Sequence, residues 1–203
     1  MAVNVAKWFS VEPKMPKNRK PRERARIISV FNQKGGVGKT TSTISIGASL
    51  AESGYRVLVV DFDPQGSLTV GLTGAHELPQ TIYDALLGRA SSRDVLLKTA
   101  VPGMDLLPAT IELSAAEMQL VNEVGREQSL ARTLAPLLPD YDVVLIDCLP
   151  SLGLLAINAL AASDSVLIPL QCEYYALRGM ALLSQTIEKV QERINPRLKV
   201  EGI

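Results

Sequence analysis

Residues 33–41 read Gln33-Lys34-Gly35-Gly36-Val37-Gly38-Lys39-Thr40-Thr41. This stretch resembles the phosphate-binding pattern G-x-x-x-x-G-K-[ST], in which backbone N–H groups surround the phosphates. The lysine of that pattern reaches the β- and γ-phosphates, and its hydroxyl binds Mg²⁺. Gly38, Lys39 and Thr40 supply the second half of the pattern, whereas Gln33 replaces its first glycine and Lys34 adds a second cation. The stretch therefore predicts a nucleotide site whose extra lysine needs an explanation.

The residues around this stretch support the same prediction. Residues 26–32 are rich in β-branched side chains and have the length of a strand. Residues 40–51 carry Ile44, Ala48 and Ala51 at helical spacing, and Gly54 follows as a stop signal. A strand, a glycine loop and a helix N-terminus in this order direct N–H groups at an anion. This context favours a phosphate loop over an incidental glycine-rich turn.

The rest of the chain alternates between strand and helix patterns. Strands are expected at residues 55–61, 104–108, 141–147, 164–169 and 199–203. Helices are expected as two short ones within 81–100, then at 114–138 with a weak point at Gly125, at 153–162 and at 175–194. Such alternation predicts an α/β fold: a mainly parallel sheet with helices on both faces and ligands at the strands' carboxyl ends. Together with the glycine loop it indicates the P-loop NTPase fold.

Three carboxylates follow buried strands at the predicted ligand edge. Asp147 ends a run of four apolar residues, as a Walker B aspartate that helps to hold Mg²⁺ does. Asp61 and Asp63 precede Pro64, so either can organise the turn. Either can also accept a hydrogen bond from an attacking water, as residues at this point do in nucleotide hydrolases.

Composition sets the broad class. The 203 residues contain 47% hydrophobic and 21% charged residues, which fits one soluble α/β domain. No apolar run approaches the roughly 20 residues of a membrane span, and the N-terminus lacks the apolar core of a signal peptide. Cys148, Cys172 and the single His76 have no metal or redox spacing. Free thiols in a reducing cytoplasm are therefore expected.

The net charge of zero conceals an asymmetry. Residues 1–26 contain eight basic and two acidic residues, a net charge of +6, and the remaining 13 basic and 19 acidic residues give −6. With three prolines among them, residues 1–26 are expected to form a flexible basic arm, and residues 27–203 the folded domain. The arm is either a solvated tail or a sequence-independent contact with nucleic acid phosphates. A contact with anionic lipid through Trp8 and Phe9 is a weaker alternative.

Four motifs in order resemble one family. The loop at 34–41 is similar to the deviant Walker A motif of the ParA/MinD ATPases. The sequences DFDPQG at 61–66, DCLPSLG at 147–153 and QCEYYAL at 171–177 are similar to the ParA (Soj-like) partition branch. The resemblance covers residues 27–203.

The resemblance implies an ATP-dependent switch for chromosome or plasmid partition. Members of this family bind ATP with Mg²⁺, form a nucleotide-sandwich homodimer and bind DNA without sequence preference. A ParB-like partner stimulates their slow hydrolysis of ATP to ADP and phosphate. The implied location is the cytoplasm, on the nucleoid, and no membrane partner is expected.

Roles follow by position in the motifs. The resemblance implies that the whole loop holds the nucleotide (Lys34, Gly35, Gly36, Val37, Gly38, Lys39, Thr40 and Thr41). Lys34 corresponds to the signature lysine that crosses to the other subunit's nucleotide, where it acts on hydrolysis or on dimer formation. Asp63 corresponds to the carboxylate that positions the attacking water, and Thr40 and Asp147 to the Mg²⁺ site. Gly35 falls where two subunits approach closely.

Two departures from the family pattern carry expectations of their own. Leu149 stands where a second proline is usual, which predicts a slightly less rigid loop after Asp147. Family members usually continue beyond the position of Ile203, so the chain is expected to be truncated at its C-terminus. The missing part normally supplies adenine contacts and basic residues of the DNA surface. Arg178 and the arm are the visible candidates for DNA binding.

Other functions stay open from the sequence. A chain without the adenine-binding end is compatible with a non-hydrolysing regulator or a module that binds DNA or ParB. A MinD-like spatial regulator requires a C-terminal amphipathic helix, which is not found in these residues. A nitrogenase-reductase-like electron carrier is disfavoured because the two cysteines do not form that family's cluster pattern.

Overall fold

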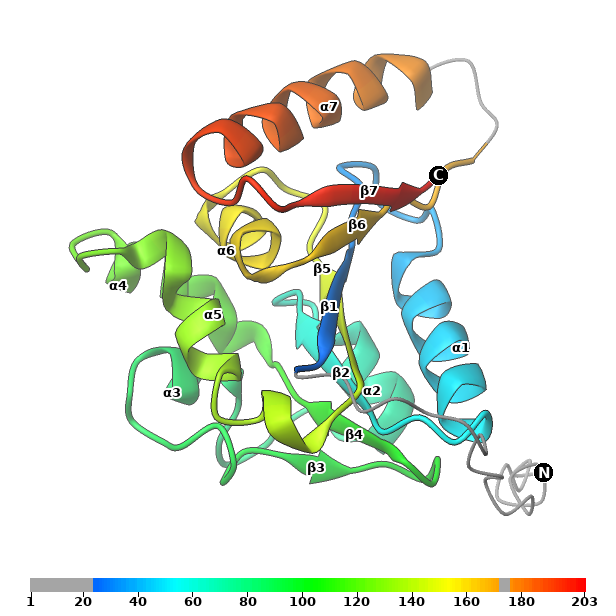
Figure 1. Cartoon of the computed structure of the whole chain (residues 1–203). Helices are drawn as coiled ribbons and strands as arrows, with labels where there is room; N and C mark the ends of the chain where they lie inside the picture. Colours follow the sequence, from blue (N-terminus) through cyan, green and yellow to red (C-terminus); the bar gives the residue numbers. More distant parts are fainter. Residues whose placement is uncertain (1–23, 172–175) are drawn as a thin grey trace.

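The computed structural model of the chain describes residues 24–171 and 176–203, and describes side chains outside residues 176–181 (Figure 1). Residues 1–23 of the predicted arm, Cys172 and the side chain of Arg178 lie outside this description. The three described residues of the arm belong to the folded domain. Arg24 forms an ion pair with Asp164, and Arg26 begins the first strand and forms an ion pair with Glu201.

Seven strands form a single sheet in the order β3-β4-β2-β5-β1-β6-β7. Their bounds are β1 Arg26–Val30, β2 Val57–Phe62, β3 Leu97–Lys98, β4 Met104–Leu107, β5 Val143–Cys148, β6 Ser165–Leu167 and β7 Lys199–Gly202. Every pairing is parallel except that of β3 with β4. The prediction of a mainly parallel α/β sheet is therefore confirmed.

The two central strands β2 and β5 are buried along their whole length, which explains their continuous apolar sequences. They run side by side in a register that pairs Val57 with Val143 and Asp61 with Asp147. Because β1 pairs with β5 on the other side, the carboxyl ends of β1, β5 and β2 are neighbours. The loops that follow these three strands therefore meet at one edge of the sheet.

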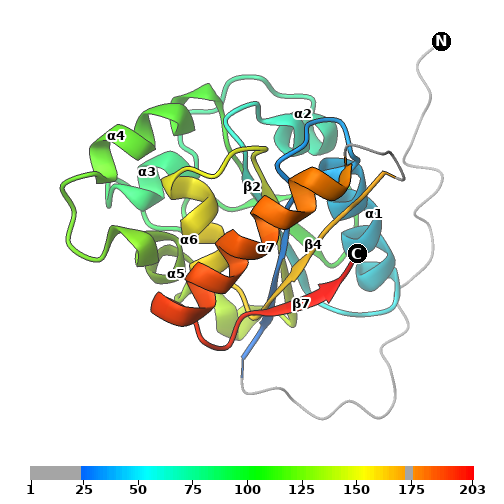
Figure 2. The same cartoon turned by 90° about the horizontal axis from the view of Figure 1, so that it is seen from above.

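Helices cover both faces of the sheet (Figures 1 and 2). Their bounds are α1 Lys39–Glu52, α2 Ser67–Thr73, α3 Ile82–Leu86, α4 Ala116–Leu120, α5 Ser129–Leu134, α6 Leu154–Ala162 and α7 Ala176–Arg193. Residues from α1 and α2 pack with one face of β2, β4 and β5 in a smaller core. Residues from α3 to α7 form a larger core on the other face. The sheet is thus the middle of three layers.

Two expected helical regions differ in the structure. Within residues 81–100 there is one short helix, α3, capped by Thr81 and Asp84, followed by the edge strand β3. Lys98 of β3 pairs with Asp105 of β4 in register and by an ion pair, and this tertiary contact overrides the local pattern. The second helix predicted there was wrong.

The helix expected over 114–138 is broken into short pieces. These are the 3₁₀ turn η2 Ile111–Ala115, α4, the turn η3 Arg126–Gln128, α5 and the turn η4 Leu138–Asp140. The main break lies at Gly125, whose φ of 67° is left-handed, at the weak point that the sequence indicated. Leu113, Ala116 and Leu120 anchor the first half of this region in the core.

Candidate nucleotide-binding site

The glycine loop connects β1 to α1 and has the conformation that a phosphate site requires. Gly36 and Gly38 have φ angles of 73° and 90°, so glycine is favoured there by the backbone itself. A Cβ added at Gly35, Gly36 or Gly38 would meet no atom of the described chain within 4 Å. Val37 is buried beneath the loop. The open side of the loop is therefore a backbone cradle with room for a ligand.

The loop leads into the N-terminus of α1, where no acidic side chain of the helix balances the positive end of its dipole. Helix α1 begins after Gly38 with no side-chain cap and no acidic residue in its first turn. Lys39 is 7% exposed, and its Nζ donates to the backbone oxygen of Lys34 at 3.3 Å. Thr41 is exposed in the same turn. Unpaired N–H groups, a helix dipole and a lysine thus converge on the cradle, as anion binding requires.

Lys34 points away from this convergence. Its side chain is exposed, and its Nζ donates to Oε1 of Gln171 at 3.5 Å, beyond the end of β6. Gln171 in turn donates to the backbone oxygen of Gly36 at 3.2 Å. The Lys34 N–H donates to Oδ1 of Asn32 at 3.0 Å, which fixes the start of the loop. The two lysines therefore occupy different places, Lys39 inside the cradle and Lys34 on its outer rim.

Thr40 and Asp147 meet although 107 residues separate them. The Thr40 hydroxyl donates to Oδ2 of Asp147 at 2.6 Å. Asp147 is 1% exposed, and its Oδ1 is buried without a hydrogen-bond partner among the described residues. Burial raises the pKa of Asp147 to about 6, and the nearby charge of Asp63 adds to this, whereas the Thr40 bond and Lys39 lower it. A cation at this point would give the unpartnered oxygen a ligand and neutralise the buried negative charge.

These groups fit Mg²⁺ in the form that nucleotide sites use. Mg²⁺ is usually held by one or two carboxylates together with substrate phosphates and waters. The residues that the structure describes contain no group of three or more His, Cys, Asp or Glu side chains that could hold a metal by themselves. Thr40 and Asp147 would therefore hold the ion together with a nucleotide rather than alone.

Asp63 lies in the turn after β2 and is half-buried. Its Oδ1 accepts from the Gln65 N–H at 2.9 Å, and its backbone oxygen accepts from Gly66 N–H at 2.9 Å. Its negative charge contributes to the raised pKa of Asp147, so the two carboxylates interact electrostatically. Asp63 thus has one carboxylate oxygen engaged in its own turn, and no hydrogen bond of the described residues engages the other.

Asp61 has a different place, which the sequence could not distinguish. It is completely buried, and its Oδ2 accepts from the Thr69 N–H at 2.8 Å and the Thr69 hydroxyl at 2.7 Å. Its Oδ1 accepts from the Asp63 N–H at 3.3 Å. Asp61 therefore ties the Asp63 turn to the start of α2. Its oxygens are occupied by the protein, so it is an organiser of the turn.

Asp61 should make the stability of the nucleotide-free protein depend on pH. Burial raises its pKa from 3.8 to about 7, the bonds from Thr69 oppose this, and Asp147 adds to it. Between these values the folded state retains a proton that the unfolded state has lost, so the free energy of unfolding falls as pH rises from 4 through 7. The loss is roughly 4 kcal/mol at most.

Chemical denaturation of Asp61→Asn and of the parent, at several pH values without Mg²⁺, tests this expectation. The asparagine keeps an oxygen for Thr69 but does not titrate, so the stability difference between the two proteins should change across the window. A constant difference from pH 4 to 8 would contradict it.

Three supporting residues of the site were not predicted from the sequence. Thr69, Asn32 and Gln171 organise the Asp61 turn, the start of the loop and its outer rim, respectively. Each is a polar residue just beyond a strand or at a helix start, which is a weak signal because such residues are common there. Gln171 appeared only as part of a family motif.

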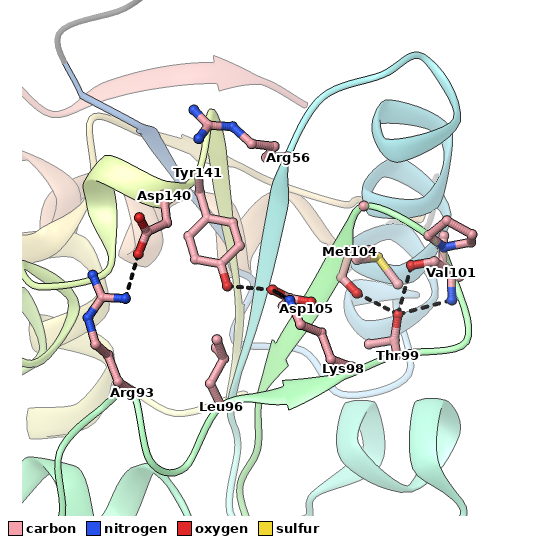
Figure 3. A pocket seen from close by; sticks show the side chains of 12 residues that line it. Arg56, Arg93, Leu96, Lys98, Thr99, Val101, Met104, Asp105, Asp140 and Tyr141 are labelled. Atoms are coloured by element: carbon pink, nitrogen blue, oxygen red, sulfur yellow. Dashed lines mark hydrogen bonds and ion pairs between the residues drawn. The ribbon is translucent and has the colours of Figure 1, made fainter. Parts of the chain in front are cut away.

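A separate cavity of about 500 Å³ lies at the other end of the strands, near the amino ends of β4 and β5 (Figure 3). Four of its charged residues form ion pairs with each other, and the fifth, Arg56, pairs with Asp142 at 3.0 Å. Arg93 lies 2.7 Å from Asp140, and Asp105 accepts from Lys98 at 2.8 Å and from the Tyr141 hydroxyl at 2.6 Å. This pairing indicates structural ion pairs, and the cavity is not part of the nucleotide site.

Within the described ranges, no helix combines the length and hydropathy that a membrane crossing requires.

Comparisons with known proteins agree with this geometry. A family model described as an AAA domain matches residues 25–200. An uncharacterized protein of Mycobacterium tuberculosis is 57% identical over 190 residues, which are 93% of this chain and 60% of that protein. The sporulation initiation inhibitor protein Soj of Bacillus subtilis is 50% identical over 179 residues, 88% of this chain and 71% of Soj. The chain thus spans 60% of the length of the mycobacterial relative.

A solved structure shows the same fold with ligands. A protein of Mycobacterium smegmatis named cobyrinic acid a,c-diamide synthase, solved with ADP and magnesium, is 50% identical with a TM-score of 0.84. The match covers 87% of this chain and 72% of that one. The same protein has been solved with an ATP analogue and magnesium. By sequence, fold and phosphate-site geometry, the chain belongs to the AAA-domain family and, within it, to the ParA/Soj-like partition ATPases.

Proposed function

We propose that this chain is the ATPase part of a partition switch. ATP and Mg²⁺ bind in the loop between β1 and α1, two ATP-bound copies form a homodimer, and hydrolysis to ADP and phosphate separates them. The dimer binds DNA without sequence preference, which places it on the nucleoid in the cytoplasm, and a ParB-like protein accelerates hydrolysis.

The position of Lys34 carries this proposal. Lys39 already lies inside the cradle, whereas Lys34 is on the outer rim and directed toward Gln171. A Cβ added to the neighbouring Gly35 would meet no described atom within 4 Å, and its φ is not left-handed, so nothing within the described chain explains a glycine. A second subunit that packs against this rim would explain both residues, because it would need a close backbone approach and would receive the lysine.

The remaining groups then have distinct tasks. Thr40 and Asp147 would hold Mg²⁺, which would neutralise phosphate charge. Asp63 would accept a hydrogen bond from the attacking water and fix its direction. Lys34 of one copy would stabilise charge on the phosphates bound to the other copy, as an arginine finger does.

Asp63→Ala should bind ATP normally and accumulate as a dimer. Phosphate release should fall by about 10²–10⁴, since removal of a positioned general base or water-orienting group has this effect. Sedimentation with ADP and with ATP measures the dimer, and a phosphate assay measures turnover. Asp94→Ala, an exposed aspartate far along the chain, serves as the control. Phosphate release by Asp63→Ala at the parent rate would remove Asp63 from its proposed role.

Gly35→Val should fold and bind ATP but remain monomeric. The open space around Gly35 accepts a side chain within one chain, whereas a partner surface pressed against it would not. We expect the dimer dissociation constant to rise at least tenfold, the effect of roughly 1.4 kcal/mol of misfit. Gly71→Ala, at an exposed position of α2, is the matched control. An ATP-dependent dimer of normal affinity in Gly35→Val would contradict a close approach at this residue.

DNA binding is tested with the ATP-bound Asp63→Ala dimer and duplex DNA at low and high salt. The proposal requires binding that depends on ATP and weakens with salt. Deletion of residues 1–23, which leaves β1 and the ion pairs of Arg24 and Arg26 intact, tests the basic arm, because each lost phosphate contact should reduce the log–log salt slope by about 0.9. ATP binding without turnover, with DNA and with a partner present, would instead favour a non-hydrolysing regulator.

A further inference from the structure

We propose that Glu117 is a positioning residue for ATP hydrolysis: it holds the far end of the loop of residues 149–153, which connects β5 and its Asp147 to α6. This inference rests on the proposed ATPase function. Glu117 belongs to α4 and does not touch the phosphate cradle. It acts through the N-terminus of α6, the helix to which the Asp147 loop leads.

The contact is a helix cap supplied by another element. Oε1 of Glu117 accepts from the Leu155 N–H at 3.1 Å. Leu155 is in the first turn of α6, whose N–H groups have no partners within the helix. Helix α6 begins after Gly153, which has no side chain to cap it, and its first turn contains no acidic residue. Glu117 therefore provides both an acceptor and a negative charge at this helix end.

Gly153 supplies an independent observation of the same contact. A Cβ added to Gly153 would lie 2.1 Å from Oε1, 2.9 Å from Cδ and 3.0 Å from Oε2 of Glu117. Gly153 has φ −79° and ψ −170°, an extended conformation open to any residue. The backbone does not demand glycine here. The Glu117 carboxylate occupies the space where a Cβ of residue 153 would stand, so a side chain there would displace it from Leu155.

The support behind Glu117 is rigid. Leu113, Ala116 and Leu120 on either side of it are completely or almost completely buried in the core. Further along α6, Asn158 accepts from the Leu130 N–H at 3.0 Å and donates to the Arg126 oxygen at 2.8 Å. The segment from α4 to α5 thus contacts α6 at two points, through Glu117 and through Asn158. The Glu117 contact is at the end of α6 that is nearer to Asp147.

The loop held in this way has a central place. Strand β5 lies between β1 and β2, so the loop after Asp147 emerges between the glycine loop and the Asp63 turn. Asp147 is bound to Thr40 on the cradle side, and Glu117 fixes the far end of the same loop. Release of that end would let the loop move beside the reacting groups, whereas the contacts of Lys39 and the glycine loop would remain.

The expected signature is a change in turnover without a change in ATP affinity. In Glu117→Ala, kcat should fall about tenfold while the dissociation constant for ATP stays within about threefold of the parent. Glu117→Gln keeps an acceptor oxygen for Leu155 and should recover most of the loss. Glu112→Ala, at an exposed acidic residue of the preceding turn, is the control for removal of a carboxylate.

Hydrogen exchange and a paired substitution test the contact itself without nucleotide. The Leu155 amide should exchange at least about tenfold faster in Glu117→Ala than in the parent. Gly153→Ala should lower the melting temperature in the parent background but have little effect in the Glu117→Ala background, because the clash is then absent. Equal exchange at Leu155, or an equal effect of Gly153→Ala in both backgrounds, would overturn the contact.

The rate of ATP hydrolysis decides whether Glu117 is a positioning residue. A parent that hydrolyses ATP and a Glu117→Ala protein with the same kcat would overturn the positioning role and leave the proposed ATPase intact. A parent without turnover would contradict the ATPase proposal itself and, with it, the positioning role, while the exchange experiment would still decide the contact.

Discussion

Replacement of Lys39 by alanine should abolish useful ATP binding, with a rise of the dissociation constant of about 10²–10³-fold. The Lys39 ammonium lies in the cradle, 7% exposed and 3.3 Å from the Lys34 backbone oxygen. A charge-assisted hydrogen bond in such a site contributes about 1.5–3 kcal/mol, and the direct attraction to the phosphates adds to it. Isothermal titration with ATP and Mg²⁺ measures the change.

Two variants make the Lys39 result specific. Lys39→Met keeps the buried stem and removes the charge, so it should fold as the parent does and still lose ATP. Lys189→Ala removes an exposed lysine of α7 and should bind ATP normally. An ATP affinity of Lys39→Met within about threefold of the parent would show that the cradle is not the phosphate site.

Replacement of Lys34 by alanine should leave ATP binding intact and remove nearly all hydrolysis. A cation supplied in trans to a phosphoryl group contributes about 10³–10⁵ in rate. Because Lys34 is on the outer rim and Lys39 fills the cradle, the first nucleotide contact should not depend on Lys34.

The Lys34 experiment needs a separate measurement of the dimer. Partner-stimulated phosphate release gives turnover, and sedimentation with ATP shows whether dimer formation is lost as well. Lys189→Ala, which removes an exposed lysine of α7, is the matched control. Turnover of Lys34→Ala at the parent rate would leave the extra lysine of the loop without a function.

The sequence was sufficient to predict the meeting of Thr40 and Asp147. Asp147 ends an apolar run typical of a parallel strand, Thr40 begins the helix that follows another such strand and its glycine loop, and parallel strands bring their carboxyl ends together. The 2.6 Å hydrogen bond between them confirms that reasoning across 107 residues. The glycine loop between a strand and a helix was likewise predicted, whereas the left-handed φ angles of Gly36 and Gly38 are seen only in the structure.

The contacts that support the site from α4 could not be predicted from the sequence. Glu117 and Gly153 lie in segments whose path depends on how η2 and α4 pack, and that region was expected to be one long helix. Its main break lies at Gly125, and buried Leu113, Ala116 and Leu120 anchor the first half of the region in the core, a tertiary contact that local periodicity does not show.

Asp61 and Asp63 show the same limit at closer range. They share a turn and a residue type, and only their surroundings divide their tasks. Asp61 is buried and accepts hydrogen bonds from Thr69, whereas Asp63 is half-buried and its charge acts on Asp147. Burial and partners are tertiary properties, so no spacing rule could assign the two roles.

Complementation between two inactive variants tests whether Lys34 of one copy acts on the nucleotide of the other. Lys34→Ala and Asp63→Ala are each expected to be inactive alone. Mixed in equal amounts with ATP, they should form heterodimers in which the Lys34→Ala subunit keeps its own Asp63 and receives Lys34 from its partner. With random pairing of a symmetric dimer, the mixture should recover about one quarter of the parent rate. A mixture as inactive as its two components, with heterodimers shown to form, would contradict the account.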